Sequence, residues 1–136
     1  MKKSFLTTFV ITLCVLAGSQ PVRAQGYRQQ IHIPFDFTVN NSVFEAGDYT
    51  VDVTNHVLRI RERAGRSIAT VLTIPTIRKQ IPEMGELVFT RYGSDYFLSK
   101  AFWAGDAAGE ELTKSRSEVL LAAKKGPRVT IALVLK

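Results

Sequence analysis

The sequence predicts a mainly β fold, which is an antiparallel sandwich or a partly closed barrel of seven strands with one short C-terminal α-helix before the last strand. Three observations lead to this expectation. Apolar and polar residues alternate with a period of two in several short runs. Residues typical of turns separate these runs. A single helix-capping pattern occurs, and it lies near the C-terminus.

The run 31–39 predicts the first strand, because an apolar residue occupies every second position. Pro34 has no backbone donor, so we expect this strand at a sheet edge. The polar segment 25–30 before it is expected to be a loose lead-in. Turn signals follow at 40–41 and at 45–48.

Two alternating runs, 49–54 and 57–63, predict a hairpin, with Asn55-His56 as the turn between them. A further strand is expected over 67–74, with Pro75 as its end. The next ten residues, 76–85, show no periodicity.

A second hairpin, rich in aromatic residues, is expected over 87–92 and 96–103, followed by a loop of small residues at 104–109. Ser115 stands three residues before Glu118, a capping-box spacing that predicts a helix over 116–125. Gly126 is the expected left-handed cap. The last strand is expected over 129–135.

The first 24 residues predict an export signal. Lys2 and Lys3 precede an apolar stretch that is too short for a transmembrane helix, and small residues precede a cleavage site between Ala24 and Gln25. Residues 25–136 are then a single β-rich domain located in the periplasm or outside the cell, with no transmembrane segment. The only cysteine, Cys14, is removed with the signal, so the mature chain forms no disulfide.

Cleavage also lowers the formal charge. The whole chain carries +6, whereas the mature chain keeps 15 basic residues against 12 acidic ones, a net charge of +3. Nucleic-acid binding usually needs a concentrated basic face and a recognisable motif, so we expect no nucleic-acid partner.

The polar residues suggest no catalytic residue, metal or cofactor. His32 and Asp36 lie on one strand face but about 13 Å apart, too far to share one ion. His56 fits a turn, Gly93-Ser94-Asp95 fits a hairpin turn rather than a nucleophile elbow, and the acidic segment of Asp106, Glu110 and Glu111 is expected to be a solvated loop.

Two clusters are candidate ligand-binding sites. Arg59, Arg61 and Arg63 share a strand face, and Arg66 follows in the next turn, so together they could clamp an anionic group. The simpler interpretation is a solvated outer face, partly neutralised by nearby acidic residues. The second cluster comprises Arg91, Tyr92, Tyr96 and Trp103, which could line a ligand groove or, through strand alternation, fill the core.

Several segments together carry a resemblance: 33–39 (IPFDFTV), 46–51 (AGDYTV), 87–93 (LVFTRYG) with 96–98 (YFL), and 115–118 (SRSE). With these the chain resembles a family of small exported proteins of acidobacterial type. The resemblance implies export and a β-rich fold across nearly all of the mature chain. It implies no activity and no catalytic residue.

The function we expect is a non-enzymatic binding or structural module of the cell envelope, with an anionic or glycan envelope component as its partner. One alternative is a small extracytoplasmic hydrolase or lyase that uses His32, Asp36 or the acidic segment. Another is a β-barrel carrier of a small apolar ligand. Edge pairing through the strand at Ile31 or at Val129 would give a homo-oligomer.

Overall fold

A computed structural model describes residues 27–126 and 128–135, so the expected signal sequence and its cleavage site lie outside the described residues. Ten strands and one helix form this part of the chain. In order they are β1 (Tyr27–Ile33), β2 (Phe37–Val39), β3 (Ser42–Phe44), β4 (Gly47–Thr54), β5 (Val57–Glu62), β6 (Ser67–Ile77), β7 (Glu86–Tyr92), β8 (Asp95–Phe102), β9 (Ala108–Leu112), α2 (Arg116–Lys125) and β10 (Val129–Val134).

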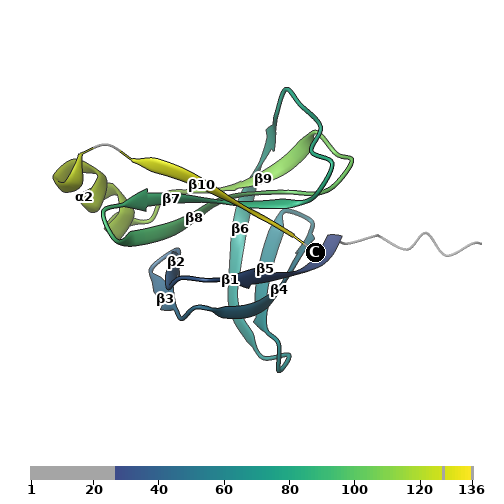
Figure 1. The fold of residues 1–136 in the computed structure, drawn as a ribbon, viewed down its shortest axis with the longest axis horizontal. Coiled ribbons are helices and arrows are strands. Elements are labelled where there is room, and N and C mark those ends of the chain that lie inside the picture. The colour runs from purple at the N-terminus through teal and green to yellow at the C-terminus, as the bar shows by residue number, and fades with distance from the viewer. Residues whose placement is uncertain (1–26, 127, 136) are drawn as a thin grey trace, which may run out of the picture.

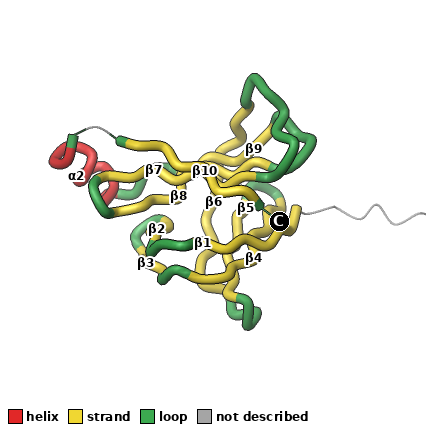
Figure 2. Tube along the Cα trace, viewed as in Figure 1, coloured by secondary structure: helices red, strands yellow, loops and turns green. Residues whose placement is uncertain are grey.

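The strands form two layers joined by β6 (Figures 1 and 2). The first layer has the order β1-β4-β5-β6, and all its pairs are antiparallel. The long strand β6 then leaves β5 and pairs through its second half with β9. In the second layer β9 pairs with β8, β8 with β7, and β7 with β10. The short β2 lies parallel to β8 and antiparallel to β3.

The mainly β class and the short helix before the last strand are confirmed, but seven strands was wrong: the described chain has ten, and the sheet is not closed. The expected strand 31–39 is two strands, β1 and β2, which pair with different neighbours. Residues 27–30, expected as a loose lead-in, belong to β1 because they pair with residues 50–53 of β4. Both β1 and β10 pair with one strand among the described residues, so each lies at an edge.

The strand β9 was also not expected, and Pro75 does not end β6 as predicted. Pro75 is tolerated because β6 has already separated from β5 at this point and pairs only with β9, opposite Glu110. Gly109 lets β9 approach β8 closely, since a Cβ at this position would overlap the Phe102 ring and the Ala101 carbonyl.

Apolar side chains from both layers meet in one core. The first layer contributes the alternate residues of β1, β4 and β5, of which Val51 and Ile60 are fully buried. The aromatic centre of the core is Phe89 of β7, whose ring makes edge contacts with Phe35 at 5.2 Å and Phe37 at 5.8 Å. Burial of this core is the main force that holds the two layers together.

The helix α2 begins as predicted and lies at one end of the molecule's long axis (Figure 1). The Ser115 hydroxyl is 3.2 Å from the Glu118 backbone nitrogen, from which it accepts a hydrogen bond. Gly126 ends the helix with a φ of 73° and a ψ of −141°, which is a positive-φ conformation but not the left-handed helical one we expected. Among the described residues, no helix is long and apolar enough to cross a membrane.

Glu118 is the buried residue of α2, and the Tyr92 hydroxyl donates to its carboxylate over 3.3 Å. Burial raises the pKa of Glu118 above its ordinary value of 4.5, although the Tyr92 hydrogen bond and the charges of Lys114 and Arg128 act in the opposite direction. The folded protein therefore binds this proton more tightly than the unfolded chain does.

We expect Glu118→Gln to gain stability relative to the wild type as the pH rises. Because the folded pKa is raised, the wild type has its full stability below the unfolded pKa near 4.5 and loses part of it as the pH rises through the folded pKa. Glutamine keeps the shape and has no proton to lose. Urea denaturation of both proteins at about pH 4 and about pH 7 checks this. A difference between the two that does not change with pH would contradict the expectation.

Candidate functional site

The outer surface of the first layer carries a group of polar residues that the strand register brings together; we call it the polar face. Strand alternation turns the apolar residues of β1, β4 and β5 into the core and leaves every second residue on the other side. One row across the strands is Arg28, Asp52 and Arg59, and the next is Gln30, Thr50 and Arg61. His32 and Asp48 form the third row, beside Arg63.

Asp52 lies at the centre of the polar face, and its side chain is only 8% exposed. Arg59 Nη1 is 3.4 Å from Asp52 Oδ2, and Arg61 Nη2 is 3.7 Å from Asp52 Oδ1. These are long ion pairs, and Oδ1 has no hydrogen-bond partner within the described chain. Arg59 donates one long hydrogen bond to Oδ2, whereas Arg61 neutralises Asp52 without a hydrogen bond to it, so most N–H groups of the two guanidinium groups are not used on Asp52.

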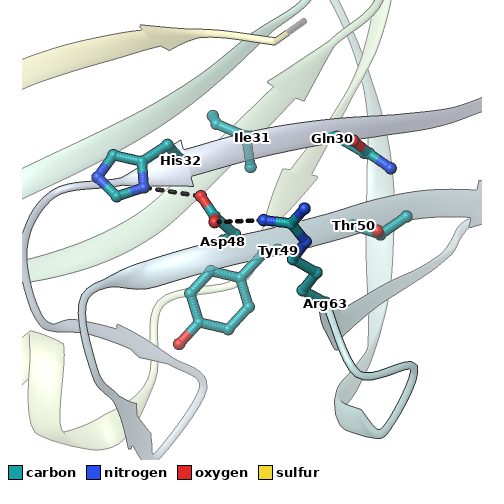
Figure 3. A pocket seen from close by; sticks show the side chains of 7 residues that line it. All are labelled: Gln30, Ile31, His32, Asp48, Tyr49, Thr50 and Arg63. Atoms are coloured by element: carbon teal, nitrogen blue, oxygen red, sulfur yellow. Dashed lines mark hydrogen bonds and ion pairs between the residues drawn. The ribbon is translucent and has the colours of Figure 1, made fainter.

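At the edge of the polar face, Asp48 lies between His32 and Arg63 (Figure 3). His32 Nδ1 is 2.8 Å from Asp48 Oδ1, and Arg63 Nη1 is 3.6 Å from Asp48 Oδ2. The hydrogen bond from His32 lowers the pKa of the Asp48 carboxyl below 3.8, and the charges of His32 and Arg63 act in the same direction. The carboxylate is thus ionised at neutral pH, whereas the Arg63 side chain stays 86% exposed.

Two adjoining hollows form a groove across β1, β4 and the end of β5. Gln30, Thr50 and Arg63 line both hollows. The first continues toward His32 and Asp48 (Figure 3), and the second toward Arg28 and Arg61. Guanidinium and side-chain amide groups are donors that bind carboxylate, sulfate and phosphate oxygens.

The charge of the polar face favours an anion. Four arginines (Arg28, Arg59, Arg61 and Arg63) stand against two aspartates (Asp48 and Asp52) and Glu62, which lines the second hollow, so the net charge is +1 with neutral histidine. Among the described residues, no ion pair is found for Arg28. Its guanidinium therefore adds to the positive potential at the groove.

The structure brings three of the four predicted arginines together on the polar face. It also adds Arg28, which was not predicted. Arg59, Arg61 and Arg63 point to one side, whereas Arg66 lies in the following turn and pairs with Glu62 over 3.0 Å. The sequence also suggested neutralisation by nearby acidic residues, and Asp52 does pair with both Arg59 and Arg61. Arg28 was missed because the segment 25–30 has no strand alternation to reveal its register.

The predicted aromatic cluster does not form one groove. Tyr92 and Trp103 are both buried, and they lie at opposite ends of the β7–β8 hairpin. Tyr96 stacks on Phe35 with ring centroids 3.9 Å apart, and the Arg91 guanidinium is 6.0 Å from the Tyr96 ring. These aromatic residues therefore serve mainly to fill the core and its border.

The segment expected to be a solvated acidic loop instead places one carboxylate inside the fold. Glu110 lies on β9 with its side chain only 10% exposed. One oxygen is 2.9 Å from His56 Nδ1, and the other accepts a 2.6 Å hydrogen bond from the Thr73 hydroxyl. Thr73 also donates its backbone N–H to the His56 carbonyl over 2.9 Å, and its hydroxyl oxygen lies 3.0 Å from the same carbonyl, so the β4–β5 turn is fixed to β6 where β6 crosses between the layers.

The remaining candidate residues have structural partners. His32 and Asp36 do not meet: Asp36 accepts the Ala46 backbone N–H at 2.9 Å, whereas His32 pairs with Asp48. Asp106 accepts the Tyr27 hydroxyl over 2.9 Å. No group of three or more potential metal ligands occurs within residues 27–126 and 128–135.

Comparison with known proteins gives no relative from which a function could be carried over. No family model matches the chain, and no curated protein and no solved structure is significantly similar to it. The function must therefore be argued from the polar face itself.

Proposed function

We propose that this protein is an exported, non-enzymatic binding module of the cell envelope, and that its polar face binds an anionic envelope component such as an acidic glycan. The observation that carries the proposal is the groove in which Arg28, Arg61 and Arg63 meet the amide of Gln30. Arg28 and Gln30 lie on β1, Arg61 on β5 and Arg63 in the turn that follows β5, and all four line the same hollow, so one ligand can contact them together.

The arrangement supports binding rather than catalysis. The long ion pairs of Arg61 and Arg63 leave their N–H groups available for a ligand. Asp48 and His32 are bonded to each other at the rim, which orients the imidazole but holds the carboxylate as an anion. A ligand that carries carboxylate or sulfate groups would displace weak contacts and gain bidentate ones.

We expect the double variant Arg28→Gln/Arg63→Gln to bind an acidic glycan at least about tenfold more weakly than the wild type, since each lost charge-assisted hydrogen bond is worth roughly 1.5–3 kcal/mol. Calorimetric titration with an oligogalacturonate is the measurement, and a neutral dextran of similar length is the negative probe. Added salt should weaken the binding, because the groove is exposed to solvent. Glutamine keeps the length and polarity of the side chains while removing their charge.

Arg66→Gln is the control, because the Arg66 side chain is 75% exposed but pairs with Glu62 and lines neither hollow of the groove. It should bind the oligogalacturonate within about twofold of the wild type. Equal binding by the double variant and the wild type would remove the polar face as the site. Hydrolysis of the glycan, lost on a single polar substitution, would instead assign an enzyme.

A further inference from the structure

The helix α2 packs on the second layer through polar groups and turns aliphatic side chains outward. Glu118 is its buried residue and bonds to Tyr92, and Lys125 Nζ is 2.6 Å from Asp95. Val119 and Leu120 are 53% and 57% exposed. A surface helix normally buries its large apolar residues against the core, whereas α2 exposes two of its three and leaves the third, Leu121, half-buried.

The helix and its flanking residues are rich in basic side chains, of which Lys125 pairs with Asp95. The segment 114–128 contains five of them (Lys114, Arg116, Lys124, Lys125 and Arg128), and Glu118, its one acidic residue, is buried. Leu120 lies four residues from both Arg116 and Lys124, so the three side chains share one face of the helix. The outward surface of α2 therefore combines aliphatic side chains with positive charge.

We propose that α2 docks the protein reversibly on an anionic lipid surface. Aliphatic side chains flanked by lysine and arginine are the composition by which a helix lies in a lipid interface, with the apolar groups among the acyl chains and the cations at the phosphates. Protein-binding hot spots are instead rich in tryptophan and tyrosine, and α2 has no aromatic residue. Its position at the end of the long axis lets a flat surface reach it (Figure 1).

The docking surface is separate from the polar face. The helix neighbours β7 of the second layer, whereas the polar face belongs to β1, β4 and β5. Lipid binding and anion binding can therefore fail independently. A short helix with two exposed aliphatic side chains gives weak, reversible attachment rather than stable insertion.

The test is cosedimentation with lipid vesicles. The protein is used in the form in which its own cells process it. Vesicles of phosphatidylglycerol and phosphatidylcholine in equal parts are compared with vesicles of phosphatidylcholine alone. Two variants separate the contributions: Arg116→Gln/Lys124→Gln removes charge, and Val119→Ala/Leu120→Ala removes apolar surface while keeping the helix propensity. The matched control is Lys79→Gln/Val43→Ala, which alters an exposed lysine and an exposed valine outside α2.

We expect the wild type and the control to bind the anionic vesicles, and each α2 variant to bind them about tenfold more weakly. Thermal melting, monitored by circular dichroism, checks that both variants fold. If one of them does not fold, the other alone still tests the proposal. Equal binding to the two kinds of vesicle, or unchanged binding by both α2 variants, would overturn the proposal. Binding to poly-glutamate without binding to anionic vesicles would overturn it too, and would assign the helix to an acidic protein.

Discussion

Replacing Phe89 with alanine should lower the free energy of unfolding by about 3–5 kcal/mol, the usual loss when a buried phenylalanine is truncated. Phe89 is completely buried, and its ring contacts Phe35 and Phe37 at the centre of the core. The substitution removes apolar contacts and leaves a cavity between elements of both layers, which cannot collapse without moving whole strands.

Chemical denaturation measures this loss, and the denaturant slope shows whether the folded state stays compact. Val43→Ala is the control, because this β3 side chain is 71% exposed and should change the stability by no more than about 0.5 kcal/mol. A loss below about 1 kcal/mol for Phe89→Ala would mean that the two layers do not pack around this ring.

Replacing Glu110 with alanine should cost about 2–4 kcal/mol of stability, whereas Glu111→Ala should cost less than about 1 kcal/mol. Without the Glu110 carboxylate, the Thr73 hydroxyl and the His56 ring lose their common acceptor at the junction of the two layers. Within the described part of the chain Glu111 pairs only with Lys100, over 3.3 Å, and its side chain is 45% exposed.

This comparison is sharp because the two glutamates are neighbours in the sequence but lie on opposite sides of β9, one buried and one exposed. Urea denaturation of the two variants at neutral pH gives the two free energies directly. Similar losses for both would show that Glu110 does not hold the β4–β5 turn to β6. In that case the junction would depend on backbone pairing and on the Thr73 contact with the His56 carbonyl.

The two proposed sites, the groove and the helix, suggest one way in which the protein could work in the envelope. An exposed, cationic helix would hold one end of the molecule at a lipid surface, and the polar face of the other layer would bind an anionic component. Both contacts are electrostatic and exposed, so both should weaken as the salt concentration rises. Variants in one site should leave the other unchanged.

Alternation and turn chemistry allowed several elements to be predicted from the sequence. The Asn55-His56 turn has φ angles of 52° and 58°, so both residues adopt the positive φ that a two-residue hairpin turn of this kind requires. The capping serine placed the start of α2 correctly. These features depend on neighbours within a few residues, which the sequence displays directly.

The strand β9 and the division of the first expected strand could not be found in this way. Small residues in β9 serve a close approach to β8, so they carry no alternation. Residues 31–39 alternate throughout, yet the chain bends at 34–36 and the two halves pair with strands of different layers. Pairing partners are distant in the sequence, and a local pattern does not identify them.

The sequence by itself determined that the fold is mainly β, where the hairpin turns and the helix begin, and that Arg59, Arg61 and Arg63 share a face, because each follows from local periodicity. Only the tertiary structure decided which groups meet across strands. It placed Arg28 beside Asp52, His32 on Asp48 and His56 on Glu110, because strand register and the crossing of β6 join residues that are far apart in the chain.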